Sequence, residues 1–319
     1  MGSCRLCPRM CGADREKGEK GYCGQGAHMR IARASLHAWE EPCISGTGGS
    51  GTVFFCGCPL GCVICQNAAI SGRKAPGREV TPGELAEVCL YLQEAGAHNI
   101  NLVTAVHFVP EVVRSLAIAV RRGLTIPIVY NTSGYENVET LRMLDGLVDI
   151  YLADCKYFSP VLSQRISRAP EYFTVCMEAV AEMIRQTGDP VFAGGLDAAA
   201  YNASLEDLTE EADYAGALME RGTIVRHLML PGQLSDSLRV VDELLSRFGD
   251  HFYLSLMNQY TPMPLIADQP DLNRRVSEEE YEKLVDHAIA AGLKNGFFQG
   301  EGTAEESFIP PFDGTIPGI

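Results

Sequence analysis

Four cysteines lie within ten residues of one another in the stretch CGCPLGCVICQN, residues 56–67. Three of them, Cys58, Cys62 and Cys65, have the spacing C-x3-C-x2-C. Three thiolates on one tight loop can hold three irons of a [4Fe–4S] cluster, whereas four would saturate it. The remaining iron keeps an open position, which is typical of catalytic metal sites, and can bind the amino and carboxylate groups of a small ligand. A zinc site and buried free thiols are the alternatives.

The other cysteines also concentrate near the N-terminus, where nine of the twelve fall within the first 65 residues. A small secreted domain would use such thiols for disulfides. This chain is long and starts without an apolar signal-peptide core, so metal binding is the better interpretation. Cys56 lies farther from the loop than its neighbours and is expected to be a packed residue.

A second group, Cys4, Cys7, Cys11 and Cys23, has the spacing C-x2-C-x3-C-x11-C. The intervening residues are polar and rich in glycine, so this segment cannot bury a core, and a metal would have to fold it. Four thiolates suit a structural zinc ion or a second, closed [4Fe–4S] cluster. Zinc is favoured here and the cluster stays open. Cys43 is a substitute ligand or a packed thiol.

Strand-type and helix-type segments alternate along the rest of the chain. The expected strands are residues 51–58, 99–104, 126–131, 148–154, 223–230 and 252–258. The expected helices are residues 81–96, 109–123, 137–144, 170–187, 235–248 and 277–291. Capping boxes are expected at Thr81 with Glu84 and at Ser277 with Glu280.

Six strand–helix units predict an α/β fold with a parallel sheet, of the partial (β/α)6 barrel type. An N-terminal cysteine-rich segment, residues 1–45, is expected to form a metal knuckle before the barrel at residues 46–299. Residues 189–221 interrupt the alternation with an acidic, small-residue insertion, which is expected to be a solvated excursion. The tail at residues 300–319 is expected to lie over the barrel or its mouth.

Polar side chains cluster where the strands end, and the active residues of a parallel barrel lie at the carboxyl ends of its strands. A buried lysine or aspartate is costly without a partner, so these groups should be paired or used. Arg226 could bind a carboxylate through two hydrogen bonds. His107 is expected to be structural. The candidates at the strand ends are Asn131, Thr132, Ser133, Asp154, Lys156, Arg226, His227, Gln259 and Tyr260.

The net charge of −15 argues against a nucleic-acid partner, which usually needs a basic face. No apolar run approaches the roughly 18 residues of a membrane helix. We therefore expect a cytoplasmic protein with no membrane partner.

The three-cysteine pattern resembles that of the radical S-adenosylmethionine (SAM) superfamily, and the wider chain resembles its pyruvate formate-lyase activating enzyme-like proteins. The resembling blocks are CPRMCGADREKGEKGYCG, LHAWEEPCISGTGGSGTVFF, HNINLVTAVHFVP, PIVYNTSGYENVETL, VDIYLADCKY, VRHLMLPG and LSLMNQYTPMP. The chain departs from the superfamily pattern at Ile64, where an aromatic residue is usual, and at residues 103–107, where a Gly-Gly-Glu segment is usual.

The resemblance implies the same partial barrel, a [4Fe–4S] cluster on Cys58, Cys62 and Cys65, and SAM as the second cofactor. The segments NTSG and LADCK are similar to segments that help hold SAM and a monovalent cation in glycyl-radical activating enzymes. Asn131, Thr132, Asp154 and Lys156 are the implied SAM contacts, although Asn131 replaces an aspartate. The implied reaction is reductive cleavage of SAM to a 5′-deoxyadenosyl radical that abstracts hydrogen from a substrate.

A radical SAM oxidoreductase of this kind needs an electron donor, expected to be flavodoxin- or ferredoxin-like. A polypeptide substrate is favoured over nucleic acid by the charge and by the activase resemblance, with a small molecule as the alternative. The competing function is an iron–sulfur electron-transfer or metal-sensing protein that does not use SAM. Such a carrier needs neither an open iron nor polar groups at a barrel mouth.

Overall fold

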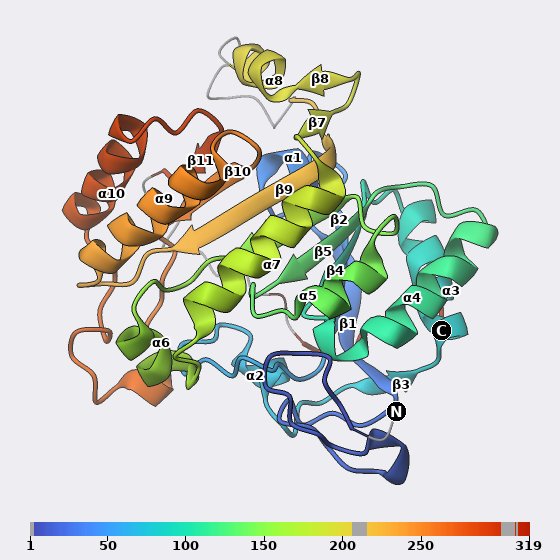
Figure 1. Cartoon of the computed structure of the whole chain (residues 1–319). Coiled ribbons are helices and arrows are strands. Elements are labelled where there is room, and N and C mark those ends of the chain that lie inside the picture. Colours follow the sequence, from blue (N-terminus) through green and yellow to red (C-terminus); the bar gives the residue numbers. More distant parts are fainter. Residues whose placement is uncertain (1–2, 206–215, 301–309, 311) are drawn as a thin grey trace.

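A sheet of mostly parallel strands runs through the molecule (Figure 1), which is represented by a computed structural model that describes residues 3–205, 216–300, 310 and 312–319. The order across the sheet is β11-β10-β9-β6-β5-β4-β2-β1-β3, so β11 and β3 are its two edges and the barrel is not closed. The parallel strands are β2 (Ser50–Phe55), β4 (Ile100–Val103), β5 (Ile128–Thr132), β6 (Ile150–Asp154), β9 (Met219–Leu228), β10 (Tyr253–Met257) and β11 (Gly296–Phe298).

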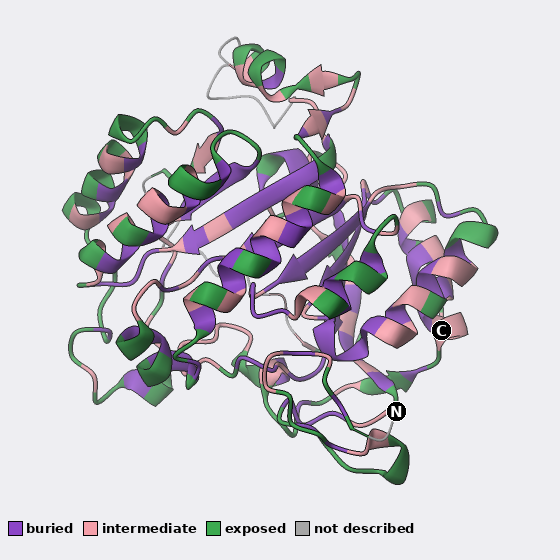
Figure 2. Ribbon diagram, in the orientation of Figure 1, coloured by how far each residue is buried: buried purple, intermediate pink, exposed green. Residues whose placement is uncertain are grey.

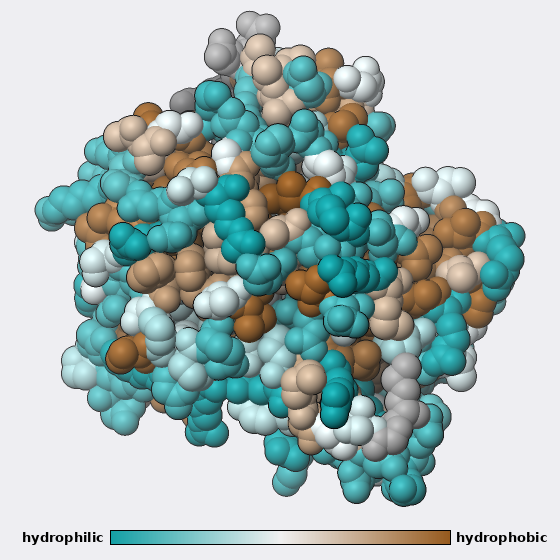
Figure 3. All heavy atoms as spheres, in the orientation of Figure 1, coloured by the Kyte–Doolittle hydropathy of each residue, from teal (hydrophilic) through white to brown (hydrophobic). Residues whose placement is uncertain are grey.

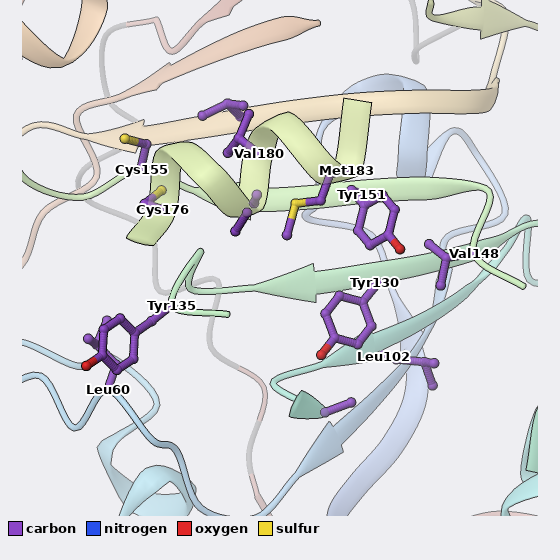
Figure 4. Close-up of a cluster of buried hydrophobic side chains, with 14 of the residues drawn as sticks. Leu60, Leu102, Tyr130, Tyr135, Val148, Tyr151, Cys155, Cys176, Val180 and Met183 are labelled. Carbon is purple, nitrogen blue, oxygen red and sulfur yellow. The ribbon is translucent and has the colours of Figure 1, made fainter. Parts of the chain in front are cut away.

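The central strands are buried on both faces, as Figure 2 shows, because helices cover a parallel sheet. All residues of β2, β4 and β5 are buried, which explains their nearly continuous apolar sequences. In Figure 4, Tyr130 and Tyr151 lie on neighbouring strands, with Val180 and Met183 coming from the helix that packs over them. The two tyrosine rings meet edge to face, with centroids 5.9 Å apart.

The expected helices follow their strands. Both predicted capping boxes form, with Thr81 accepting from the Glu84 amide and Ser277 from the Glu280 amide. The expected helix at residues 137–144 divides into a helix of four residues and a 3-10 turn, Arg142–Leu144. The helices are α1 (Pro42–Ser45), α2 (Ala68–Ser71), α3 (Pro82–Glu94), α4 (Val109–Arg121), α5 (Val138–Leu141), α6 (Pro160–Ser167), α7 (Tyr172–Thr187), α8 (Ala198–Leu205), α9 (Leu234–Phe248) and α10 (Glu278–Ala290). Their outer surfaces make the face in Figure 3 largely hydrophilic.

Three strands of the main sheet were not expected. β1 (Met29–His37) pairs antiparallel with β2 and with β3 (Arg78–Val80), so part of the cysteine-rich segment belongs to the main sheet. β11 adds a seventh parallel strand beyond β10. The prediction of a partial, unclosed α/β barrel is confirmed, with a longer sheet than six units.

The acidic insertion forms a small projecting unit at the top of Figure 1, with β7 (Val191–Phe192), β8 (Leu196–Asp197) and α8. Phe192 and Tyr201 are fully buried and stack with ring centroids 3.7 Å apart. The expectation of a merely solvated excursion is wrong for these residues, because both rings contact Tyr253 of β10 and belong to a buried cluster that includes Val129 and Ile224 of the main sheet. Residues 206–215 of the insertion lie outside the described residues, as do residues 301–309 and 311 of the tail.

In the described part of the chain, no helix has both the length and the apolar character needed to cross a membrane.

Candidate functional site

The loop after β2 carries the three cysteines of the C-x3-C-x2-C pattern, and all three line one pocket. Burial, together with the neighbouring thiols Cys62 and Cys65, raises the pKa of Cys58 to about 12. Burial also raises the pKa of Cys65. All three cysteines are partly buried, and the raised pKa values keep the Cys58 and Cys65 thiols protonated until a cation stabilises their thiolates, so the donor set fits a cationic iron–sulfur cluster.

The same pocket collects the polar groups that follow the strands of the sheet. Because carboxyl ends of parallel strands meet at one edge, residues from β5, β6, β9 and the segment after β10 come together. Seven of the predicted strand-end candidates line it together with Thr104 and Leu228, and the three cysteines line it as well; the seven are Asn131, Thr132, Ser133, Asp154, Lys156, Arg226 and Gln259.

An ionic network lies at the base of this pocket. Arg226 donates from Nε to Asp154 Oδ1 at 2.9 Å, from one terminal nitrogen to Glu40 Oε2 at 3.1 Å and from the other to Asn131 Oδ1 at 2.7 Å. Lys156 Nζ donates to Asp154 Oδ2 at 2.6 Å. Two carboxylates thus face two cations, with each side chain less than a quarter exposed.

The protonation states follow from burial and from these partners. Burial opposes ionisation of Asp154, but Arg226 and then Lys156 hold its pKa below the ordinary value. Burial likewise opposes the charge on Lys156, and Asp154 raises its pKa. For Glu40 burial is the larger influence and raises the pKa, with Arg226 acting against it. We infer that Asp154, Lys156 and Arg226 are charged at neutral pH.

Glu40 was missed by the sequence analysis, although it lies in the resembling block LHAWEEPC. It follows β1 and accepts from Asn101 Nδ2 at 3.0 Å and from Asn131 Nδ2 at 3.3 Å in addition to Arg226. The signal that could have found it is the pair of acids at positions 40 and 41, directly before Pro42. Both carboxyl groups are buried.

Two candidates occupy supporting positions. The Thr132 hydroxyl donates to the buried carboxyl of Glu136, whose pKa is raised to about 8 by burial. Gln259 accepts from Gln66 of the cysteine loop through its backbone carbonyl at 3.1 Å and from Gln299 through its side chain at 3.0 Å. Gln259 therefore ties the end of β10 to the loop.

Tyr260 does not reach the pocket. Its ring is buried, and its hydroxyl donates to the Leu272 carbonyl at 2.9 Å, so it braces the segment after β10. His227 is buried and does not line the pocket either; its Nδ1 lies 2.7 Å from the Cys155 carbonyl oxygen. His107 Nε2 lies 2.8 Å from the Cys56 carbonyl, in keeping with a structural role, and Cys56 itself is fully buried.

Thr104 carries an unusual backbone conformation at the end of β4, with φ of +60°. A β-branched residue rarely adopts a positive φ, and such strain collects at functional sites. Its amide donates to the Asn131 carbonyl at 2.9 Å, which holds it at the pocket wall.

The four N-terminal thiols interact with one another. Cys4, Cys7 and Cys23 are buried, and Cys11 is exposed. Burial raises the pKa of Cys7 to about 12, and the nearby Cys23 adds to the rise. Within the described residues, no three Cys, His, Asp or Glu side chains are arranged to hold a single metal ion. The thiolates of a [4Fe–4S] cluster bind different irons, so their spacing is wider than that around one ion.

Comparison with known proteins identifies the family. The model of the radical SAM superfamily matches residues 52–245. An uncharacterized protein of Methanocaldococcus jannaschii is 27% identical over 292 residues, covering 90% of this chain and 74% of that protein.

Two solved structures are similar at low identity. A domain of pyruvate-formate lyase-activating enzyme from Bacteroides vulgatus is 13% identical with a TM-score of 0.37, covering 60% of this chain and 91% of that domain. Streptococcus suis SuiB is 10% identical with a TM-score of 0.46, covering 77% of this chain and 48% of that protein. The family match spans more than half of the chain and includes the cysteine loop and the strands β4, β5, β6 and β9, so this chain belongs to the radical SAM superfamily.

Proposed function

We propose that this chain is a radical SAM enzyme that abstracts hydrogen from a segment of a polypeptide, in the manner of a glycyl-radical activase. The observation that carries the proposal is the pocket itself. It joins the three thiols of the cysteine loop to the network of Glu40, Asp154, Lys156 and Arg226 at the carboxyl ends of the strands.

Cys58, Cys62 and Cys65 are the residues that would hold the [4Fe–4S] cluster. When bound, the reduced cluster supplies the electron that cleaves SAM and yields the radical that abstracts hydrogen from the substrate. The protein positions the ligands and excludes water. Ser167 supports this arrangement, because its hydroxyl donates to the Cys62 sulfur at 3.0 Å.

The ionic network is suited to the methionine end of SAM, which carries an amino and a carboxylate group. Lys156 and Arg226 can face a carboxylate, and Asp154 and Glu40 can face an ammonium group. Because the network offers both cationic and acidic partners, a zwitterion can exchange partners with it without leaving a charged group unpaired. Asn131 and Thr132 complete this side of the pocket.

A polypeptide substrate is supported by three features. The chain carries a net charge of −15, which disfavours the phosphate backbone of nucleic acid. The sheet is unclosed between β11 and β3, which leaves an approach for an extended segment. Trp39, 60% exposed, lies at the pocket beside His37 and Phe54 and offers a surface for an inserted side chain. A small-molecule substrate is the alternative.

The reaction also needs an electron from outside the chain. We propose that a flavodoxin- or ferredoxin-like protein supplies it. This can be tested by replacing chemical reductant with each class of donor and measuring SAM cleavage.

The substrate proposal is tested by deuterium transfer. Reconstituted protein is incubated with SAM, reductant and deuterated candidate substrates, and label is followed into 5′-deoxyadenosine. Transfer from a peptide or protein supports the proposal. Transfer from a small metabolite, with none from any peptide or protein, contradicts the polypeptide assignment. SAM cleavage without reconstituted cluster would contradict the family chemistry instead.

A further inference from the structure

The four-cysteine N-terminal segment, residues 4–25, packs directly against the loop that carries the cluster cysteines. Figure 1 shows this segment beside the loop that leads into α2. Two parts of the segment make the contact, and we name them the first arm, residues 7–11, and the second arm, residues 23–25. The two arms reach different parts of the loop, so their relative position fixes its shape.

The first arm acts through Arg9, which lies between Cys7 and Cys11. Its guanidinium donates to the Pro59 carbonyl at 2.9 Å and the Leu60 carbonyl at 3.0 Å, both between the first two cluster cysteines. The same side chain donates to the carbonyls of Ser167 at 2.7 Å and Arg168 at 2.6 Å. Arg9 therefore fastens the loop to the end of α6, where Ser167 contacts the Cys62 sulfur.

Aromatic rings hold Arg9 in place. Its guanidinium carbon lies 4.3 Å from the centroid of the Tyr22 ring and 5.2 Å from that of Tyr135. Arg9 therefore has four carbonyl acceptors and two aromatic neighbours. A lysine at this position would lack the planar guanidinium and could not make the same set of hydrogen bonds.

The second arm meets the loop through its backbone. A Cβ atom on Gly57, directly before Cys58, would lie 2.5 Å from the Cys23 carbonyl oxygen, and Gly57 has φ of +82°. A Cβ atom on Gly24 would lie 2.4 Å from the Arg73 Cα, beyond α2. Both glycines are needed because the second arm touches the loop at both of its ends.

The thiols of the two arms are prepared for a metal. The Cys11 and Cys23 sulfur atoms both lie close to Gly21, where an added Cβ atom would be 3.3 Å from the first and 3.4 Å from the second. Arg15 adds a contact to the Cys23 sulfur at 3.5 Å. Donors aimed at sulfur stabilise thiolates and are the outer contacts typical of thiolate metal sites.

We propose that Cys4, Cys7, Cys11 and Cys23 bind one thiolate-ligated iron–sulfur cluster, which locks the two arms together and so holds the loop of Cys58, Cys62 and Cys65 in its cluster-binding conformation. Arg9 is the positioning residue, because it connects the first arm to the loop through its hydrogen bonds to the Pro59 and Leu60 carbonyls. Metal binding supplies the folding energy that a polar, glycine-rich segment lacks. The loss of this centre loosens the loop without removing any of its cysteines.

The first test removes the cluster cysteines. Full-length Cys58→Ala/Cys62→Ala/Cys65→Ala protein, prepared anaerobically, should retain about one cluster's iron and sulfide per chain. Metal analysis and the visible spectrum distinguish this cluster from a zinc ion. A variant that holds no iron–sulfur cluster overturns the proposal. This test needs no SAM cleavage, so its result is independent of the proposed function.

The second test loosens each arm in protein that keeps the cluster cysteines. Cys11→Ser is chosen because Cys11 is exposed, so the substitution removes a thiol without disturbing the core. Arg9→Met removes the guanidinium and its hydrogen bonds to the loop but leaves all four thiols in place. Arg5→Met is the matched control, since Arg5 is exposed and its side chain makes no hydrogen bond or ion pair with the described residues.

Hydrogen exchange at Gly57 and Val63 reports loop order, because their amides donate to the carbonyls of Ile70 at 2.7 Å and Ile166 at 3.0 Å. We expect Cys11→Ser and Arg9→Met to speed exchange there by about tenfold and to speed cluster loss to a chelator, with Arg5→Met unchanged. Circular dichroism confirms that each variant is folded, and Arg9→Lys provides a milder second variant. The proposal is overturned if Cys11→Ser and Arg9→Met are folded but exchange these amides and retain the cluster at the same rates as the wild-type protein.

Discussion

Arg226 is the centre of the ionic network, and its removal gives the sharpest test of how the pocket is balanced. The guanidinium contacts Asp154, Glu40 and Asn131, and all of these side chains are largely buried. In Arg226→Met the two carboxylates would face Lys156 alone. Truncating one partner of a buried ion pair costs about 3–5 kcal/mol, because the remaining charge is left without compensation.

The expected loss can be converted into a melting temperature. With 319 residues and an unfolding entropy of about 2.1 cal/mol/K per residue, a loss of about 3–5 kcal/mol lowers the thermal midpoint by about 4.5–7.5 °C. Thermal unfolding of the cluster-free protein at pH 7, followed by circular dichroism, measures this shift directly.

Glu40→Gln provides the internal control. On the Arg226→Met background it restores the balance between Asp154 and Lys156, so the double variant should recover about 1–3 kcal/mol relative to simple addition of the two single effects. The reasoning is refuted if Arg226→Met costs less than about 1 kcal/mol, the range of exposed ion pairs, or if the two effects add.

Three further outcomes are expected. Asp154→Ala and Lys156→Ala should weaken SAM binding, measured by calorimetry, and leave the cluster spectrum intact; unchanged affinity in both would make the pair structural. Burial lowers the pKa of His107 to about 3, so this residue should contribute a loss of about 1.4 kcal/mol of stability per pH unit as pH falls from 6.5 towards 3, and His107→Gln should reduce the slope of stability against pH by that amount in denaturant titrations. Phe192→Ala should lower the free energy of unfolding by about 3–5 kcal/mol, since the ring is fully buried against Tyr201; a change below 1 kcal/mol would mean that the insertion is not packed as described.

The sign of the pH prediction follows from linkage. His107 is buried and neutral in the folded protein, whereas in the unfolded chain it binds a proton below about pH 6.5. Between pH 6.5 and 3 the unfolded state therefore holds the extra proton, and acid favours unfolding. A pH profile identical in wild type and His107→Gln would contradict this assignment.

The sequence predicted the central strands because a parallel sheet buries both faces and leaves an uninterrupted apolar pattern, as in β2 and β4. β11 was not predicted because it has only three residues, none of them buried, and no pattern can be recognised over that length. β1 was missed because its partners, β2 and β3, pair with it antiparallel, and antiparallel pairing leaves no helix between strands as a marker.

The candidate site was predictable wherever a polar side chain ends or directly follows a recognised strand, as Asp154 and Lys156 do. Glu40 follows an unrecognised strand, and its role depends on Arg226, which is 186 positions away in the chain. A charged residue before a proline looks like surface until the fold supplies that partner. Tyr260 illustrates the opposite error, because a position after a strand does not fix where a side chain points, and its hydroxyl meets Leu272 instead.

Reductive cleavage of SAM by the full chain is the most direct test of the central claim. Wild-type protein and the Cys58→Ala/Cys62→Ala/Cys65→Ala variant are reconstituted anaerobically with iron and sulfide, then incubated with SAM and dithionite, and 5′-deoxyadenosine is quantified. We predict that wild type forms 5′-deoxyadenosine and methionine and that the variant forms neither while keeping its fold. Equal product from both proteins, or a wild-type cluster that leaves SAM intact, would contradict the account.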